Sequence, residues 1–346
     1  MTVMNERDQT QAQAQIARLM DGYLSTQMLY VAAELGVADV LAVEPRTAEQ
    51  IAQAVQADPG ALQRVLRGLA AEGVLDELPD GRFGLTPAGA LLRADAPGSQ
   101  RGAILARGRL YYYALTGLLD ALREGGTPFA RAHGTSFFEY LAARPAETAA
   151  FQASMADRSR QEAAAVVAAS DFGRFRRLVD VGGGRGGLLA AILAAAPNLH
   201  GVLHDRPEVV EQARSALATT AAAGQWTAVG GDFLAAVPSG GDVYVLSRVL
   251  HDWNDAAATC ILTSCRQAMA ANAVLLVVEA VLPERAVDQP AATRMDLHML
   301  TLLGGRERTA AECQALLAGA GFRLGRVIPT DSPVGLSVLE SVPAPP

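Results

Sequence analysis

A glycine-rich segment, VDVGGGRGG, separates a run of buried-strand character from a helical run. Gly182, Gly184 and Gly187 follow the spacing G-x-G-x-x-G, and Asp205 ends the next β-rich run, eighteen residues after Gly187. Glycines at these positions let the backbone turn tightly and approach a ligand, and the helix that follows offers free N–H groups at its start. An acid after the second strand can accept from the hydroxyls of a ribose. The pattern predicts a ligand that contains adenosine, and it fits a dinucleotide and S-adenosylmethionine equally well.

Further residues beside this loop discriminate between the two ligands. Asp180 precedes the glycines inside the strand, and Asp232 and Phe233 follow the third β-rich run in the sequence GGDF. An acid there can accept from the adenine amino group while an aromatic ring packs against the base. Because S-adenosylmethionine has no pyrophosphate, the N–H groups of the loop would face its amino-acid end. We favour S-adenosylmethionine and keep an NAD-type dehydrogenase as an alternative, which a titration with each cofactor would separate.

The elements that must position these residues alternate in type beyond residue 176. We expect strands at 177–181, 200–205, 225–230, 242–247, 273–279, 322–330 and 334–340, and helices at 187–196, 207–220, 255–271, 290–303 and 309–319. Such alternation predicts an α/β domain with a doubly wound, mostly parallel, Rossmann-like sheet, which binds ligands at the carboxyl ends of its strands.

The first half of the chain differs, because residues 10–170 have an almost wholly helical pattern. Residues 47–89 combine two helices, a turn at Asp58-Pro59-Gly60 and a hairpin through Pro79-Asp80-Gly81, which is a winged-helix pattern. Five arginines are offset by six acids between residues 46 and 93. A helix that reads a DNA groove needs a basic face. We therefore expect an interaction or dimerisation module and no binding of nucleic acid.

Composition sets a few further limits. The 346 residues carry a formal net charge of −7, and 50% of them are apolar, which is enough for sizeable hydrophobic cores. No apolar run of signal-peptide or membrane-span length is visible, so we expect a cytoplasmic protein. The cysteines Cys260, Cys265 and Cys313 lack metal-type spacing, which favours a reducing compartment and no structural metal. Eight aromatic residues between 100 and 170 suit an apolar substrate pocket, although core packing is the commoner role.

Six segments, in chain order, carry a resemblance to a known family: VDVGGGRGG, HDRPEVV, GGDF, LSRVLHDWND, VVEAVLP and MDLHMLTLLGGRERTAAE. They resemble the motifs of the S-adenosylmethionine-dependent O-methyltransferases of the caffeate and hydroxyindole type, which include bacterial enzymes of secondary-metabolite and antibiotic biosynthesis. The resemblance implies a homodimer with a winged-helix-like dimerisation domain at 1–100 and a helical linker and substrate-pocket region at 101–172. It also implies a methyltransferase domain at 173–346 that binds S-adenosylmethionine, releases S-adenosylhomocysteine and uses no metal.

The resemblance also assigns a cofactor site. Ser247 would meet the polar edge of the cofactor, where plant members often have lysine, and Trp253 would stack near the adenine. Arg206 occupies a position where leucine is usual in the family, so we expect different packing around Asp205. The residues expected around the cofactor are Arg158, Asp180, Gly182, Gly184, Asp205, Arg206, Asp232, Phe233, Ser247, Arg248 and Trp253.

His251 matches the general base of the family, and Glu279 and Glu307 match the two acids that flank it. An adjacent carboxylate would hold the imidazole in one tautomer and stabilise its charged form. The structural alternatives are an edge-strand acid for Glu279 and a cap of the helix near Thr309 for Glu307. The residues expected around the acceptor are Met155, Asp252, Met295, His298 and Met299, the last three on one helical stripe of a kind that more often belongs to a core.

The pKa difference between the acceptor hydroxyl and the histidine limits the class of acceptor. Transfer of a proton from a phenol near pKa 10 to a histidine near pKa 6.5 is uphill by about 5 kcal/mol, against roughly 12 kcal/mol for an aliphatic hydroxyl. We therefore expect transfer of a methyl group to the phenolic hydroxyl of a small aromatic secondary metabolite. Beside the dehydrogenase, two further alternatives remain, namely the same fold using the bound cofactor for hydroxylation, decarboxylation or pericyclic chemistry, and a winged-helix regulator, which would need a basic recognition face that the sequence lacks.

Overall fold

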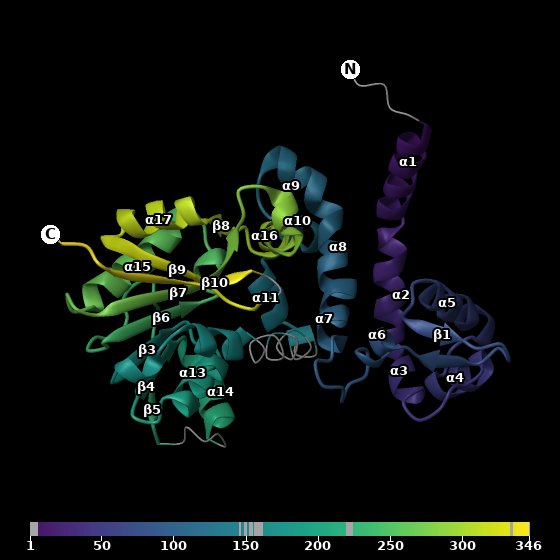
Figure 1. Ribbon diagram of the computed structural model, residues 1–346, viewed down its shortest axis with the longest axis horizontal. Helices are drawn as coiled ribbons and strands as arrows, with labels where there is room; N and C mark the ends of the chain where they lie inside the picture. Colours follow the sequence, from purple (N-terminus) through teal and green to yellow (C-terminus); the bar gives the residue numbers. More distant parts are fainter. Residues whose placement is uncertain are drawn as a thin grey trace. The chain divides into compact units, whose positions relative to one another are not determined.

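The computed structural model describes residues 6–144, 147–148, 151, 155, 162–218, 224–332 and 335–345. Contacts divide the chain into two compact units, Met1–Tyr113 with Leu141–Asp157 and Ala114–Tyr140 with Arg158–Pro346 (Figure 1). The stretch Ala114–Tyr140 thus groups with the C-terminal unit, and the three-part division at residues 100 and 172 stays a prediction.

The N-terminal unit is helical and contains a two-stranded hairpin. Its elements are α1 (Glu6–Met20), α2 (Gly22–Leu35), α3 (Val37–Val40), α4 (Ala48–Val55), α5 (Pro59–Ala71), β1 (Leu75–Glu77), β2 (Phe83–Leu85), α6 (Pro87–Ala90), α7 (Arg101–Ala106), η1 (Arg107–Tyr111) and α8 (Tyr112–Ala114). Helix α4 starts at a capping box of Thr47 with Gln50, and α5 starts at Asp58, whose side chain caps it, with Pro59 in the first turn. Strands β1 and β2 pair antiparallel, so the order helix, turn, helix, hairpin predicted for 47–89 is confirmed.

One face of α5 supplies much of the core of this unit. Leu62, Leu66 and Leu69 recur at helical spacing and are at most 3% exposed, and they cluster with Ile51 of α4 and Phe83 of the hairpin. The hairpin therefore packs on the helix pair through apolar side chains.

The C-terminal unit is built on an eight-stranded sheet with the strand order β5-β4-β3-β6-β7-β10-β9, and β8 pairs with β7. Its strands are β3 (Arg177–Val181), β4 (His200–Asp205), β5 (Trp226–Gly230), β6 (Val243–Ser247), β7 (Val274–Leu282), β8 (Arg308–Thr309), β9 (Phe322–Pro329) and β10 (Leu336–Pro343). Strands β3 to β7 run parallel, and β10 is antiparallel to β7 and β9. The chain proceeds from β3 to β4 and β5 on one side and returns to β6 and β7 on the other, which makes the carboxyl ends of β3 and β6 a topological switch point. The predicted doubly wound, mostly parallel sheet is confirmed.

Helices cover both faces of this sheet (Figure 1). The helices that begin in this unit are η2 (Leu115–Gly117), α9 (Leu118–Glu124), α10 (Pro128–His133), α11 (Phe137–Ala142), a helix at 162–169, η3 (Phe172–Arg174), α13 (Gly187–Ala195), α14 (Pro207–Leu217), η4 (Leu250–Asp252), α15 (Asp255–Ala268), η5 (Ala286–Asp288), α16 (Pro290–Leu302) and α17 (Ala310–Gly319). Successive residues of a strand point to opposite faces. Accordingly Val179 packs in the core with α15 and α17, and Leu178 packs in the core with α13 and α14.

Four predicted ends were wrong by about three residues. Helix α14 ends at Leu217 and not at 220, and α15 ends at Ala268 and not at 271. Strand β7 continues past 279 to Leu282, and β10 continues past 340 to Pro343. Strand β7 is longer because its end is paired on both sides, with β10 as far as Ala280 and with the two-residue β8 beyond it.

The aromatic residues of the 114–140 stretch pack on one another. Phe129 is fully buried, stacks on His133 with ring centroids 4.2 Å apart, and meets Phe137 and Tyr140 edge-on at 5.1 and 5.2 Å. Core packing therefore accounts for Phe129 without a ligand.

Two findings bear on the limits set by composition. Across the described ranges, no helix combines the length and the apolar character that crossing a bilayer requires. The three cysteines are unpaired, with Cys265 and Cys313 buried and Cys260 exposed.

Candidate active site

The glycine loop lies between β3 and α13, at the carboxyl edge of the sheet. Gly182 and Gly184 have left-handed backbones, with φ of 72° and 57°, a conformation that favours glycine. A Cβ atom on Gly182 would lie 2.8 Å from Val249 Cγ2, and one on Gly183 would lie 2.5 Å from Asp180 Oδ2. Larger residues therefore do not fit, and the loop backbone lies close to the segment that follows β6.

Asp205 ends β4 beside this loop. Its Oδ2 accepts from Gly184 N–H at 2.9 Å, and its Oδ1 accepts from Arg206 N–H at 2.7 Å. The Arg206 side chain is exposed, and its guanidinium lies 3.4 Å from Glu208. The arginine that replaces the usual leucine therefore leaves the Asp205 carboxylate in contact with the loop.

Asp180 is buried under the loop, with 2% of its surface exposed. Its Oδ2 has no hydrogen-bond partner among the described residues. Burial, together with the nearby Asp205 carboxylate, raises the pKa of Asp180 to about 7. Two carboxylates at this place favour a ligand that brings positive charge, as the amino-acid end of S-adenosylmethionine does, and disfavour a pyrophosphate. The residues present therefore fit S-adenosylmethionine better than a dinucleotide.

The residues predicted for the adenine come together from separate loops. The rings of Phe233 and Trp253 meet edge-on with centroids 6.0 Å apart, and Phe233 Cε1 lies 3.6 Å from the place of a Cβ on Gly182. Asp232 Oδ1 accepts from an amide two residues further along the chain at 2.9 Å, which fixes the carboxylate at the loop. Ser247 is half-buried at the end of β6. An apolar wall and a fixed acid thus lie next to the glycine loop.

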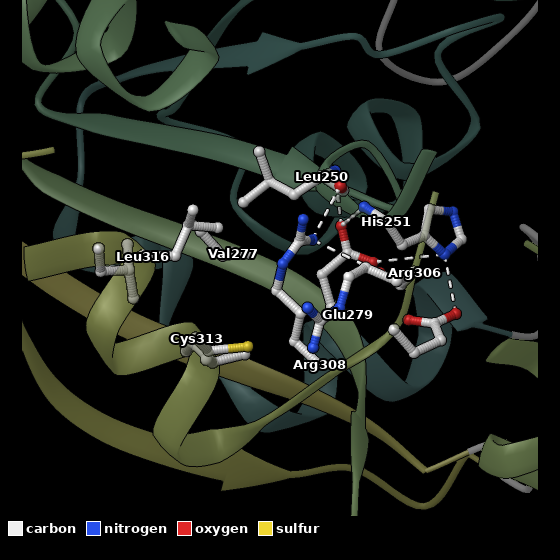
Figure 2. A pocket seen from close by; sticks show the side chains of 11 residues that line it. Leu250, His251, Val277, Glu279, Arg306, Arg308, Cys313 and Leu316 are labelled. Atoms are coloured by element: carbon white, nitrogen blue, oxygen red, sulfur yellow. Dashed lines mark hydrogen bonds and ion pairs between the residues drawn. The ribbon is translucent and has the colours of Figure 1, made fainter. Parts of the chain in front are cut away.

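The predicted base lies on a tight turn, η4, shortly after β6. The N–H groups of Val249, Leu250 and His251 converge on Glu279 Oε1, at 3.1, 2.8 and 3.4 Å. Figure 2 draws the bonds from Leu250 and His251. Glu279 belongs to β7 and is 5% exposed. Its carboxylate therefore holds the main chain of the turn that carries the histidine.

The imidazole of His251 lies among carboxylates from three segments. Its Nδ1 lies 2.8 Å from Glu307 Oε1 and 3.7 Å from Glu279 Oε2, and its Nε2 lies 3.3 Å from Asp252 Oδ1. An ionised Glu307 can only accept, so Nδ1 carries a proton and the neutral ring keeps its lone pair on Nε2. Glu307 is therefore the direct partner of the imidazole, and Nε2 is the nitrogen that can take up a proton.

Charges around the ring raise the pKa of His251 above its ordinary value. Burial and the Arg248 guanidinium lower the pKa, but the carboxylates of Glu279, Asp252 and Glu307 together raise it by more. The pKa of Glu279 is itself raised to about 7, first by burial and then by the Glu307 carboxylate. A base of raised pKa takes a proton from a phenol at a smaller free-energy cost.

Two residues that the sequence did not single out also hold this turn. The buried Arg308 guanidinium donates to Leu250 O at 3.0 Å and to Trp253 O at 2.9 Å, and its Nε and Nη2 donate to Asp255 Oδ1 at 3.0 and 2.8 Å. A Cβ atom on Gly305 would lie 2.0 Å from the carbonyl oxygen of the histidine, so only glycine fits there. Neither residue carries a sequence signal, because both act on backbone that is distant in the chain.

A small pocket lies behind the histidine, on the side of β7 and α17 (Figure 2). Its lining is Leu250, His251, Val277, Glu279, Arg306, Glu307, Arg308, Cys313, Leu316, Leu317 and Leu339. The free space is on the order of one water molecule. It cannot hold an aromatic acceptor, which must therefore reach His251 from another side.

His251, Glu279 and Glu307 could also each offer one metal ligand, because their ligand atoms lie within 4.8 Å of one another. However, the Arg248 guanidinium lies 3.5 Å from Glu307 Oε1. A fixed positive charge at this place opposes a divalent cation. The donor set suits a proton better than a metal ion, and the expected absence of a metal stays a prediction.

Helix α16 borders the base cluster. Asp296 Oδ1 accepts from Glu307 N–H at 2.9 Å. Met295 and Met299 are buried on the same helix, and His298 is half-buried. The helix therefore supports Glu307, while a contact of its methionines with the acceptor stays a prediction.

Two residues that were predicted to contact the acceptor or the cofactor are not part of the site described above. Met155 belongs to the N-terminal unit, and Arg158 lies outside the described residues. Their contacts with cofactor and acceptor stay predictions.

Comparison with known proteins identifies both parts of the chain. An O-methyltransferase dimerisation domain matches residues 17–95, and an O-methyltransferase domain matches residues 114–323. The phenazine O-methyltransferase PhzM of Lysobacter antibioticus is 43% identical over 344 residues, which cover 99% of this chain and 100% of the relative.

Solved structures agree with this relation. CalO1, a methyltransferase of calicheamicin biosynthesis in its S-adenosylhomocysteine-bound form, matches with a TM-score of 0.84 and 40% identity over 99% of this chain and 100% of its own. The O-methyltransferase NcsB1 of neocarzinostatin biosynthesis, in complex with S-adenosylhomocysteine and 1,4-dihydroxy-2-naphthoic acid, matches with a TM-score of 0.81 and 35% identity over 92% and 96%. The chain is a member of the S-adenosylmethionine-dependent O-methyltransferase family, alongside bacterial enzymes of secondary metabolism.

Proposed function

We propose that this protein transfers a methyl group from S-adenosylmethionine to a phenolic hydroxyl of a small aromatic secondary metabolite, with His251 as the general base. The observation that carries the proposal is the buried imidazole whose Nδ1 lies 2.8 Å from Glu307, which leaves Nε2 to accept a proton. His251 lies at the same edge of the sheet as the glycine loop and Asp205. NcsB1, a relative solved with a dihydroxynaphthoic acid, supports an aromatic acceptor.

Several residues would hold the cofactor, which supplies a methyl group on a sulfonium. Asp205 would accept from the ribose hydroxyls and Asp232 from the adenine amino group, while Phe233 and Trp253 would pack against the base. The carboxylate of Asp180, with its partnerless Oδ2 beneath the loop, would attract the positively charged amino-acid end. The contacts of Arg158, Gly182, Gly184, Arg206 and Ser247, together with the main chain at Arg248, complete the proposed cofactor site.

The base chemistry follows from the position of the ring. Nε2 of His251 takes the proton of the acceptor hydroxyl, which makes the oxygen a better nucleophile toward the methyl group that the bound cofactor would supply, with S-adenosylhomocysteine as the leaving group. Glu307 holds the tautomer and stabilises the imidazolium that forms. Positioning of the acceptor supplies much of the remaining rate, and we assign it to Met155, Asp252, Met295, His298 and Met299.

A dimer is the second part of the proposal. Five apolar side chains on α1 and the start of α2, namely Ile16, Leu19, Met20, Tyr23 and Leu24, are 46 to 68% exposed. They recur at helical spacing, and this stretch falls almost wholly within the match to the dimerisation domain. A second copy of the chain would cover this stripe, and light scattering at micromolar concentration should report twice the mass of the chain.

The test of the activity is transfer of labelled methyl from S-adenosylmethionine into a panel of phenols and matched aromatic amines. His251→Gln should slow transfer about a hundredfold or more, with a cofactor dissociation constant within twofold of wild type. His200→Gln, at the opposite end of a sheet strand, is the matched control and should retain wild-type turnover. Label that enters only amines would contradict the hydroxyl assignment. A consumed acceptor that gains oxygen, loses carbon dioxide or rearranges without gaining a methyl group would contradict methyl transfer.

A further inference from the structure

Arg248 has an unusual backbone. It follows β6 directly and has φ of 58°, and among the non-glycine residues of the described ranges only Gln56 shares a positive φ. Gln56 ends helix α4, where a left-handed residue is common, but Arg248 ends a strand. Val249 returns to the right-handed region at φ −112° and ψ −51°. This left–right pair directs successive N–H groups to one side, as in an anion-binding nest, and Glu279 Oε1 occupies that position.

The side chain of Arg248 turns toward the base cluster. It is 16% exposed, and its Nη1 lies 3.5 Å from Glu307 Oε1. The same oxygen lies 2.8 Å from His251 Nδ1, so the two nitrogen atoms are at most about 6 Å apart. A permanent cation and the imidazole therefore share one carboxylate oxygen.

The charges around the base are mostly negative. The charged groups that face His251 or its partners are Arg248 and Asp252 on its own turn, Glu279 on β7, Glu307, Arg306 and Arg308 near β8, Asp296 on α16, and Glu162 on the helix at 162–169. Arg308 is engaged by Asp255, and Arg306 by Asp255 and Glu312. Three carboxylates thus approach the ring, while Arg248 is the cation that acts on it among the described residues.

A moderate rise in pKa helps a base, but a surplus of negative charge that raises the pKa far above the working pH leaves the base protonated. Carboxylates close to an imidazole stabilise its protonated form, and a protonated imidazole cannot take a proton from the acceptor. We propose that Arg248 is a positioning residue for the base: its guanidinium forms an ion pair with Glu307 and offsets the carboxylates, so that Nε2 of His251 stays free to accept a proton. This inference rests on the proposed function, in which His251 is the base.

The experiment reads the protonation of His251 directly. Histidine-labelled protein is titrated by NMR, and the His251 signal is assigned by its loss in His251→Gln. Arg248→Gln keeps a polar side chain but removes the charge, and it should raise the pKa of His251 by about one unit, a tenfold change in the protonation equilibrium. Arg248→Lys should restore most of the wild-type value. Arg174→Gln removes an arginine that lies 2.7 Å from Glu340, far from the base, and should leave the His251 signal unchanged.

Kinetics give a second readout that a purely structural role would not produce. In Arg248→Gln the acid limb of the kcat/KM profile should move up by about one pH unit. At pH values below the pKa of the base, kcat/KM should therefore be about tenfold lower than in wild type, and at high pH it should equal the wild-type value. The cofactor dissociation constant should stay within twofold. If Arg248→Gln does not fold, Arg248→Met replaces it with the same expected shift. Arg248→Lys is then the control, and its His251 pKa should stay near the wild-type value.

Three outcomes would overturn the inference. The first is an unchanged pKa of His251 in a folded charge-removing variant. The second is a uniform loss of kcat/KM at every pH. The third is a large loss of cofactor affinity with unchanged protonation, which would place the guanidinium at the cofactor instead. The NMR titration needs no acceptor, so a wild-type protein that methylates no hydroxyl but shows the expected shift would refute the proposed function and leave the role of Arg248 intact.

Discussion

Glu307 and Glu279 both flank the histidine, and the geometry predicts that a change to glutamine slows the chemical step at Glu307 but lowers thermal stability at Glu279. Glu307→Gln keeps an acceptor oxygen for His251 Nδ1, which lies 2.8 Å away in the wild type, but removes the charge that stabilises the imidazolium. A hydrogen bond to a charged partner contributes about 1.5–3 kcal/mol and a neutral one about 0.5–1.5 kcal/mol. The midpoints of these ranges differ by about 1.2 kcal/mol, which corresponds to a chemical step slower by roughly eightfold to tenfold.

Glu279→Gln acts on the main chain instead. Its Oε1 receives three backbone N–H groups, whereas its Oε2 lies 3.7 Å from the imidazole. Exchange of the carboxylate for an amide weakens these three bonds, so the thermal midpoint should fall by a few degrees. Because the turn rather than the proton acceptor is affected, turnover of the folded variant should change by less than that of Glu307→Gln.

Single-turnover methyl transfer at pH 8, with enzyme in excess, separates the two effects from acceptor binding and product release. Calorimetry supplies the thermal midpoint, and titration supplies the cofactor dissociation constant, which should stay near wild type in both variants. The reasoning is refuted if Glu307→Gln reacts at the wild-type rate while Glu279→Gln loses tenfold at an unchanged midpoint. That result would make Glu279 the partner of the imidazole.

Three further predictions concern the loop and the turn. Asp205→Ala should weaken cofactor binding at least tenfold by calorimetric titration, and an unchanged dissociation constant would contradict the ribose assignment. The pKa of Asp180 is raised to about 7, and a positively charged ligand binds its ionised form more tightly, so affinity should rise severalfold from pH 6 to pH 8; Asp180→Asn should abolish this dependence. Gly305→Ala should lower both the thermal midpoint and kcat, because its Cβ would collide with the His251 carbonyl, whereas Gly319→Ala, with nothing within 4 Å, should change neither.

Much of the C-terminal unit could be predicted from the sequence, because its signals are local. The strand β3, the glycines and helix α13 lie next to one another in the chain, and β-rich runs alternate with helical ones at parallel-sheet spacing. The two-residue β8 and the short turn η4 escaped prediction, since neither is long enough to show a period.

The roles of the two acids could not be predicted in the same way. Glu279 accepts from main-chain N–H groups because the left-handed backbone at Arg248 turns them toward its carboxylate. No residue pattern in the sequence indicates this backbone conformation. For Glu307, a helix cap was an equally good explanation, yet the sequence already held the evidence against it. Thr309 and Glu312 form a capping box in T-x-x-E, so the helix does not use Glu307.

The turn that carries His251 is held through its main chain. Glu279 accepts from its N–H groups, Arg308 donates to its carbonyl oxygens, and Gly305 packs against its backbone. None of these contacts uses the imidazole, so a protein with glutamine at this position keeps the shape of the turn. Such a slow variant can serve as bait: loaded with S-adenosylhomocysteine, which has no methyl group to transfer, and passed through a metabolite extract, it retains the natural acceptor unconverted, ready for identification by mass spectrometry.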